Sequence, residues 1–323
     1  MSAKRTPGAG FVLALLTAAT FSTSGSFARS LTDAGWSPGA AVAARISAAA
    51  LMLAVPAIVS LRGRWHILRR NATIVAIYGL VAVAGCQVCF FNAIQTLPVG
   101  VALLLEYLGT VLVVGWMWIR HHQRPRRLTV AGSVVAVVGL VCVLDLLGSG
   151  RLDAVGVLWG LGAAVGLAVF FVLSSRIDGN LPPIAMASAG MTVGALTLLG
   201  FGAVGVVPMR ETFGSVDFAS HRVSWLIPVL GLSLVAAAIA YVIGISAARI
   251  LGPKLASFVG LTEVVFAVLV AWALLGEVPT GLQLGGGVLI VAGVALVRLD
   301  ELRSTDDVEA ALDASPELET APA

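Results

Sequence analysis

Two stretches decide the fold of this chain: Val130–Val143, which reads VAGSVVAVVGLVCV, and Leu284–Val297, which reads LGGGVLIVAGVALV. Both are apolar, and both place small residues at matching positions. Their glycines correspond in pairs, Gly132 with Gly286 and Gly139 with Gly293. Self-similarity within one chain indicates that one structural unit is present twice.

The same correspondence extends upstream of both stretches. Pro98 precedes Glu106 by a short apolar run, and Pro253 precedes Glu263 in the same way. In both halves, therefore, a proline opens an apolar segment that carries an acidic residue near its middle. We divide the chain into a short N-terminal cytoplasmic segment, two repeats and a tail: residues 1–10, 11–147, 154–299 and 300–323.

The composition identifies the solvent of this chain. Of its 323 residues, 59% are hydrophobic and only 11% are charged, and the mean hydropathy is +0.99. A soluble domain carries about 25% charged residues. A water-soluble fold of this length cannot hide so much apolar surface, whereas a lipid bilayer accommodates it. We therefore expect membrane lipid and small molecules as partners, and no nucleic acid.

Hydropathy predicts ten transmembrane helices, each near the roughly 20 residues needed to cross the hydrocarbon. They cover about Phe11–Ala28, Gly39–Leu61, Ala72–Gln95, Val99–Ile119, Leu128–Leu147, Ala154–Ser175, Ile184–Val207, Val223–Ser246, Leu255–Leu275 and Thr280–Leu299. Because each repeat has five spans, the second copy enters the membrane upside down. The expected fold is an all-α membrane protein with ten transmembrane helices in two inverted five-helix repeats, which places a site between the halves.

The basic residues predict the orientation. With the N-terminus in the cytoplasm, most of the 20 lysines and arginines fall in cytoplasmic segments, as the positive-inside rule requires. An even number of spans returns the C-terminus to the same side, so we expect a multi-pass protein of the cell (inner) membrane. Residues 300–323 are polar and acidic without an apolar period. They are expected to form a disordered cytoplasmic tail, which either solubilises the chain or recruits a partner.

Few ionisable side chains lie within the predicted spans. Glu106 and Glu263 occupy one span in each half, and Arg45 lies in the second span. Such groups cost roughly 2.5–3.5 kcal/mol each to insert, so they persist where they face protein or water. A carboxyl group removed from water favours its neutral form, so either glutamate could bind substrate or carry a proton. The alternative is that the two glutamates bond neighbouring helices.

Arg45 also has two interpretations. Its planar guanidinium could neutralise Glu106 or hold a substrate carboxylate through two parallel hydrogen bonds. The alternative is that Arg45 lies near the outer end of its span and extends its charged group to the membrane surface.

Uncharged polar and aromatic residues add candidates for the lining of a site. Two pairs share a helix face by their spacing, one in the third span and one in the first. The full set of candidate substrate- or proton-binding residues is Glu106, Glu263, Arg45, Asn92, Gln95, Tyr107, Ser22, Ser26, Tyr241 and Trp159. For the uncharged members, the alternative is hydrogen bonding between neighbouring helices.

The sequence has no recognisable catalytic or cofactor motif. It contains no Walker loop, no GxSxG and no HExxH, so neither ATP hydrolysis nor a hydrolase is expected. Cys86 and Cys89 form a CxxC within an apolar span, without the second pair that a zinc site needs. We interpret them as small packing residues. The sequence predicts a protein that is not an enzyme and binds no cofactor or metal.

The sequence resembles the EamA-type drug/metabolite transporter superfamily. The segment Thr262–Val297 looks like the closing motif of that superfamily, and its core residues are Gly276, Glu277, Gln283, Gly286 and Gly293. The segment Pro98–Thr110, PVGVALLLEYLGT, resembles the threonine/homoserine exporter branch, and Arg45 also fits the family pattern. The resemblance covers Phe11–Leu299. It implies ten spans, two inverted repeats, a central cavity and export of small solutes, often amino acids.

We therefore expect a secondary transporter that exports small polar metabolites, plausibly amino acids, by alternating access, with coupling to a proton gradient. Drug efflux and metabolite import are the alternatives within transport. A cavity that is wide and aromatic would favour drugs, and one that is small and polar would favour amino acids. A membrane scaffold or receptor that acts through its acidic tail is the alternative of another class.

Overall fold

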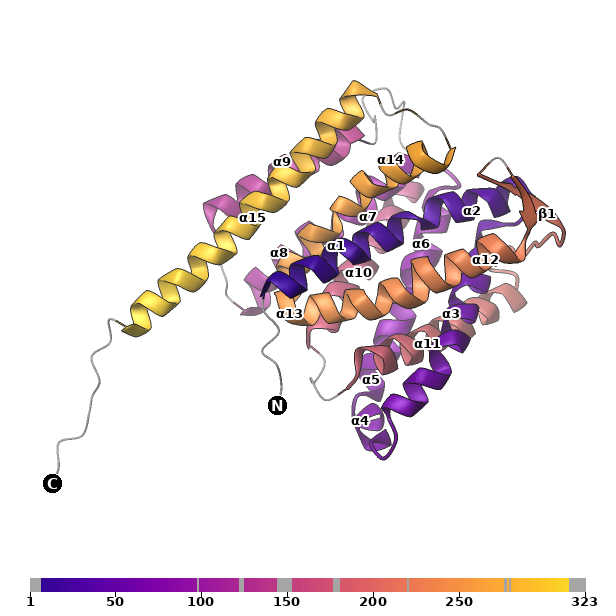
Figure 1. The fold of residues 1–323 in the computed structure, drawn as a ribbon, viewed down its shortest axis with the longest axis horizontal. Coiled ribbons are helices and arrows are strands. Elements are labelled where there is room, and N and C mark those ends of the chain that lie inside the picture. The colour runs from indigo at the N-terminus through magenta and orange to yellow at the C-terminus, as the bar shows by residue number, and fades with distance from the viewer. Residues whose placement is uncertain are drawn as a thin grey trace.

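A computed structural model describes residues 7–97, 99–121, 125–143, 153–176, 181–219, 221–275, 278 and 280–313, and these are mostly helical (Figure 1). The first half contains α1 (Pro7–Ser22), α2 (Ser24–Asp33), α3 (Pro38–Ser60), α4 (Trp65–Arg70), α5 (Ala72–Ile77), η1 (Tyr78–Gly85), α6 (Cys86–Ala93), α7 (Val99–Tyr107), α8 (Gly109–His121) and α9 (Arg127–Val143).

The second half contains α10 (Ala154–Arg176), α11 (Pro183–Ala203), β1 (Ser215–Phe218), β2 (His221–Ser224), α12 (Leu226–Ser233), η3 (Leu234–Ile239), α13 (Ala240–Gly260), α14 (Thr262–Leu275) and α15 (Gly281–Asp313). Within the described ranges, eight helical segments are long and apolar enough to cross a membrane, and Arg127–Cys142 is a shorter apolar helix. The eight begin at Gly8, Pro38, Ala72, Ala102, Ala154, Pro183, Leu226 and Gly281.

The difference from ten predicted spans arises where helices run together or break. The predicted eighth span continues without a loop as far as Gly260, so the start of the predicted ninth span belongs to the same segment, Leu226–Gly260. Gly252 marks the bend inside it, with φ of 75°. Glycine adopts this left-handed conformation without strain, and Pro253, which cannot donate a backbone hydrogen bond, follows directly. The rest of the predicted ninth span is α14.

Each half also contains a helix that is interrupted beside its glutamate. Leu108 separates α7 from α8, directly after Glu106 and Tyr107, and Leu261 separates α13 from α14, shortly before Glu263. A π-helical turn likewise occurs once in each half, as η1 and η3. Such turns are rare and are frequent at functional sites.

The closest helix pair joins the two halves at the stretches that repeat in sequence. A Cβ atom on Gly132 would lie 2.8 Å from the carbonyl oxygen of Gly293, and one on Gly139 would lie 2.7 Å from that of Gly286. Side chains are therefore excluded, and the backbones of α9 and α15 touch. Because the two contacts run in opposite order along the helices, α9 and α15 are antiparallel, and Figure 1 shows them side by side along one edge of the bundle.

Other contacts also run between the halves. The helices α3 and α11 pack together, α1 packs against α13, and α10 packs against α6, α7 and α8. The core under these contacts includes the fully buried side chains Tyr78, Ile46 and Met191. The two halves therefore form one interleaved bundle.

A two-stranded hairpin covers one end of the bundle, beside α2 and α12 (Figure 1). It corrects the all-α prediction, because β1 and β2 pair antiparallel with Val216 opposite Val223. Trp36 fixes the connection before it: its indole nitrogen donates a 2.7 Å hydrogen bond to the carbonyl of Thr212, and its ring lies 5.7 Å from that of Trp225. The short polar loop that hydropathy indicated here is thus folded.

The last helix continues past the predicted end of the tenth span. Disorder is expected from residue 300, whereas α15 extends to Asp313; residues 314–323 lie outside the described residues. The segment after Leu299 contains good helix formers such as Glu, Leu, Arg and Ala, and extending an existing helix avoids the cost of nucleation. Asp300, predicted to be solvated, is only 3% exposed.

Candidate functional site

A cavity of about 840 Å³ lies within the bundle and is lined by both halves. From the first half, α1, α2, α3, α6 and α7 contribute, and from the second, α10, α13, α14 and the start of α15. Its size is near the upper end of the range for ligand pockets, roughly 300–1,000 Å³.

The three ionisable side chains singled out in the spans all line this cavity. Arg45 from α3, Glu106 from α7 and Glu263 from α14 surround it. Arg45 is 7% exposed, whereas both glutamates are only half-buried because the cavity exposes part of each. Both carboxyl groups are near enough to act electrostatically on Arg45. The tertiary fold thus gathers charges that are far apart in the sequence.

Arg45 is only partly satisfied by the protein. Its Nη2 donates a 2.5 Å hydrogen bond to the carbonyl oxygen of Ala236, which lies in the π-helical turn η3. Its Nε is buried and has no hydrogen-bond partner within the described part of the chain. A buried guanidinium donor without a partner is rare, because leaving it unpaired is costly. This donor is therefore available to an acceptor that enters the cavity.

Each glutamate contacts a neighbour that can hydrogen-bond it. The Cys86 thiol lies 3.4 Å from Oε1 of Glu106 and equally far from the carbonyl oxygen of Ala163. The Tyr107 side chain hydrogen-bonds the carboxyl group of Glu263. Tyr107 directly follows Glu106 in α7, so one turn of the first half reaches both carboxyl groups.

Four aromatic rings form a continuous wall along the cavity, here called the aromatic wall: Phe21, Tyr241, Phe170 and Phe171. Successive ring centroids are 5.2, 5.5 and 5.1 Å apart, each with edge-to-face geometry. The Arg45 guanidinium lies 5.9 Å from the centroid of Phe21. The charged group of the cavity therefore meets the aromatic wall at one end.

The sequence candidates divide into two groups by position. Six of the ten line the cavity: Arg45, Glu106, Tyr107, Glu263, Tyr241 and Ser22. The other four, Ser26, Asn92, Gln95 and Trp159, are not among its lining residues. Asn92 and Gln95 instead donate to backbone carbonyls of their own helix. Trp159 was the only tryptophan expected to line a cavity, but its ring is 39% exposed on the outer surface.

Sequence reasoning missed two parts of the lining. Cys86 was interpreted as a packing residue, yet it lines the cavity beside Glu106. Phe21, Phe170 and Phe171 were not singled out at all, because phenylalanine is common in every membrane span. A helix that is apolar on all sides carries no periodic signal to tell a cavity-facing ring from a lipid-facing one.

The cavity reaches one end of the bundle. Its lining includes Thr32 at the end of α2, Pro38 at the start of α3, Ile94 after α6 and Gln283 at the start of α15. Its innermost members include Ala14 and Ser257. Within the described residues, the lining stops short of the opposite helix ends. The cavity is therefore open toward the end that bears the hairpin.

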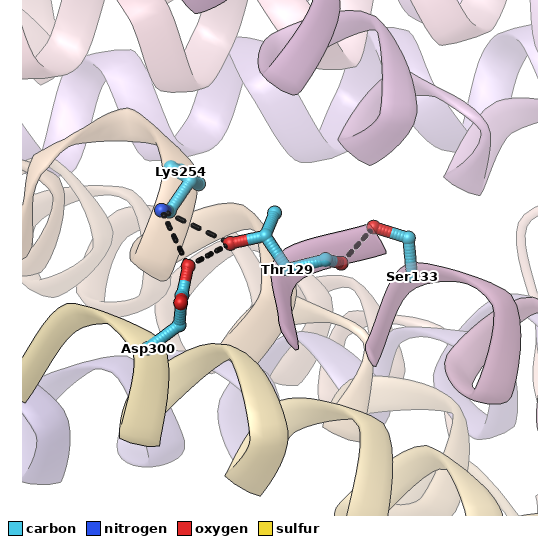
Figure 2. A network of polar contacts seen from close by, with 4 residues as sticks. All are labelled: Thr129, Ser133, Lys254 and Asp300. Atoms are coloured by element: carbon cyan, nitrogen blue, oxygen red, sulfur yellow. Dashed lines mark hydrogen bonds and ion pairs between the residues drawn. The ribbon is translucent and has the colours of Figure 1, made fainter. Parts of the chain in front are cut away.

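A second polar cluster lies at the opposite end, and Figure 2 shows it. Asp300 of α15 accepts a hydrogen bond from the Thr129 hydroxyl of α9, and its Oδ2 lies 3.9 Å from the Lys254 Nζ of α13. Lys254 also donates to Thr129 Oγ1 at 3.3 Å. Asp300 is 17 positions after Gln283, or roughly 25 Å along the axis at 1.5 Å per residue. We call Thr129, Lys254 and Asp300 the end cluster.

Known proteins resemble this chain over most of its length. The chain is 23% identical over 237 residues to the uncharacterized inner membrane transporter YicL of Salmonella typhimurium, covering 73% of this chain and 76% of that protein. It is 26% identical over 221 residues to an uncharacterized transporter of Archaeoglobus fulgidus, covering 68% and 73%. It is 28% identical over 210 residues to the threonine/homoserine exporter RhtA of Salmonella typhimurium, covering 64% of each.

The fold is also found among solved structures. One protein crystal structure, 21% identical in sequence, matches with a TM-score of 0.72 over 90% of this chain and 97% of its own. The EamA-like transporter family matches residues 8–145 and matches again at residues 154–299. Together with the apolar helices, these matches identify a multi-pass membrane transporter. This chain belongs to the EamA-like transporter family.

Proposed function

We propose that this chain is a secondary transporter that exports small polar metabolites, amino acids in particular, across the inner membrane by alternating access. The observation that carries the proposal is the meeting of Arg45, Glu106 and Glu263 around one cavity between the halves. Buried ionisable groups in a membrane protein mark a path for substrates or ions.

The chemistry of this group matches a zwitterion. The free Nε of Arg45 offers a donor to a carboxylate, which arginine binds best with two parallel hydrogen bonds. Glu106 and Glu263 offer acceptors to an ammonium group. Either carboxyl group is also able to exchange a proton with the water in the cavity, which would couple transport to a proton gradient. The relative RhtA, named as a threonine/homoserine exporter, supports amino acids as the class.

Two inverted five-helix repeats explain the internal contacts. Gly132 matches Gly286 in sequence but touches Gly293, and Gly139 matches Gly293 but touches Gly286. Such an exchange of partners is what a two-fold axis between α9 and α15 produces. The paired π-helical turns and paired helix breaks fit the same symmetry. Inverted repeats allow one site to open alternately to each side.

The basic residues favour a cytoplasmic location for the end cluster and an outer location for the hairpin. In that orientation the cavity opens outward and the end cluster closes the cytoplasmic side. An exporter must then open the cytoplasmic side to load its substrate, which requires the end cluster to separate.

Reconstitution tests the proposal directly. Purified protein in liposomes is loaded with a labelled mixture of amino acids, and efflux is measured with and without an imposed proton gradient. Replacement of Glu106 or Glu263 by glutamine is expected to reduce efflux at least about tenfold, because each loses its charge at nearly constant volume. Leu158→Ala, on the exposed outer surface, is the matched control. Undiminished efflux in both glutamine variants would refute the assigned roles.

Drug efflux is the second candidate, and one observation favours it: the cavity is large and largely aromatic. The two functions differ at Arg45, because a cationic drug gains nothing from a guanidinium in its site. Efflux of a lipophilic cation that survives Arg45→Met, with no amino acid efflux, would identify a drug transporter.

Deletion of residues 304–323 tests the scaffold alternative. The deletion keeps Asp300 and its contacts, so the folded bundle is expected to remain intact. A transporter keeps most of its efflux after this change, whereas a scaffold that acts through its tail loses its function.

A further inference from the structure

We infer that the substrate is an amphipathic amino acid with a bulky, planar apolar side chain, and that the aromatic wall selects it over small hydroxylated amino acids. This inference rests on the proposed function and specifies its substrate class. The wall is formed by Phe21, Tyr241, Phe170 and Phe171.

The arrangement of polar and apolar groups is the first argument. The guanidinium of Arg45 lies at one end of the wall, against Phe21, and Glu106 and Glu263 lie near it. A substrate whose carboxylate and ammonium groups occupy this charged group extends its side chain along the wall. Edge-to-face and offset aromatic contacts stabilise a ring there beyond simple burial.

The hydroxyl groups of the lining give the second argument. Those of Thr17, Ser22 and Ser257 each donate to a backbone carbonyl oxygen of their own helix, at 2.8 Å in every case. Their protons are therefore not free to bond a substrate hydroxyl. A polar side chain would lose its water without gaining equivalent partners, which lowers affinity by roughly tenfold.

Gly260 makes the space beside the wall. A Cβ atom at this position would lie 3.0 Å from Cζ of Phe171, and both residues line the cavity. The absence of a side chain at Gly260 leaves the Phe171 ring in place. A methyl group there displaces the ring by a few tenths of an ångström, toward the space that a bulky substrate would fill. Gly260→Ala therefore narrows the site without removing any charge.

The experiment is a binding and efflux comparison in purified full-length protein. The probes are phenylalanine, cyclohexylalanine, threonine, homoserine, phenethylamine, which lacks the carboxylate, and hydrocinnamate, which lacks the ammonium. Phenylalanine is expected to bind and exit at least about tenfold better than threonine or homoserine. Phenethylamine and hydrocinnamate are expected to bind weakly, because each leaves one part of the charged group unpaired.

Two variants separate selection from packing. Phe171→Ala and Gly260→Ala are expected to lower phenylalanine affinity about tenfold and to leave threonine affinity within about twofold. Phe201→Ala, at an exposed position away from the cavity, controls for loss of an aromatic ring, and thermal unfolding checks that each variant folds.

The outcomes distinguish the two levels of the proposal. Threonine or homoserine bound as tightly as phenylalanine, with equal losses for all probes in Phe171→Ala, overturns the aromatic selection and leaves amino acid export standing. Absence of binding and efflux for every amino acid, with efflux of phenethylamine, overturns the proposed function as well. Equal binding of cyclohexylalanine and phenylalanine overturns the planar requirement and retains the apolar one.

Discussion

The cavity and the end cluster each hold buried charges, but they satisfy them differently. In the cavity, Arg45 keeps a buried Nε without a partner in the described chain, and two carboxyl groups share one cation. In the end cluster, Asp300 receives both the Thr129 hydroxyl and the Lys254 ammonium. Saturated polar groups rigidify a structure, whereas unsaturated ones are costly unless a ligand completes them. The difference separates a binding region from a closing contact in the same bundle.

Loss of Arg45 should have the largest effect on the cavity side of this comparison. Arg45→Met removes the donor to a substrate carboxylate and is expected to reduce amino acid efflux about 100-fold, as for loss of charged hydrogen bonds. Arg45→Lys keeps the charge but loses the planar fork, so an intermediate loss is expected. Efflux from proteoliposomes measures both. Wild-type efflux in Arg45→Met would mean that its unpaired donor does not mark the binding site.

The glycine seam that connects the two regions comes next. Gly293→Val on α15 would place its side chain against Ala136 and the Gly132 carbonyl, where even a Cβ atom lies at 2.7 Å. We expect the free energy of unfolding to fall by about 2–3 kcal/mol. Gly285→Val, on the same helix with nothing within 4 Å of its Cβ position, is the control and should change it by less than about 0.5 kcal/mol. Equal losses in both would show that the seam is not tightly packed.

Breaking the end cluster should shift which side of the membrane reaches the cavity. Asp300→Asn keeps the shape but removes the charge that faces Lys254, and because Lys254 is partly exposed we expect a loss of about 1–2 kcal/mol at the closed end. Ser257, which lines the cavity, is replaced by cysteine in a chain without its native cysteines. Labelling by an impermeant maleimide from the closed side is expected to rise several-fold.

The control for this experiment is Arg303→Gln, an exposed position on the same helix. Labelling that stays unchanged in Asp300→Asn would mean that the end cluster holds the helices together without governing access to the cavity.

The smallest expected effect concerns Cys86. Cys86→Ala removes a thiol 3.4 Å from Glu106, and since thiols are weak donors the loss in efflux should be about two- to fivefold. Cys142→Ala, which is not among the cavity-lining residues, controls for loss of a thiol. A loss as large as that of Glu106→Gln would raise Cys86 to an essential partner of the carboxyl group.

Much of the fold follows from the residues taken in order. The apolar composition, the prolines before Glu106 and Glu263 and the glycines of the two repeats indicated a helical membrane protein of the EamA type, which the family match confirms. The predicted number of spans differs from the eight long apolar segments within the described residues, because chain direction at Gly252 and Leu261 is set by local backbone geometry. The hairpin was missed because its strands are short and its residues mostly polar.

The candidate site was harder to predict than the fold. Rare charges such as Arg45 were found because a charge in hydrocarbon is costly wherever it points. Trp159 and Asn92 were placed in the same set, but they lie away from the cavity. Asp300 was assigned to a tail, although it is buried against α9 and α13.

The sequence alone therefore determined the solvent, the helices, the family and the few charges that must be sheltered, because hydropathy and the cost of a buried charge are properties of residues in order. Only the tertiary structure decided which polar and aromatic residues share the cavity and which close its far end. The physical reason is that lipid is as apolar as a protein core. A membrane helix consequently carries little one-dimensional signal to show whether a given side chain faces lipid, a neighbouring helix or the cavity.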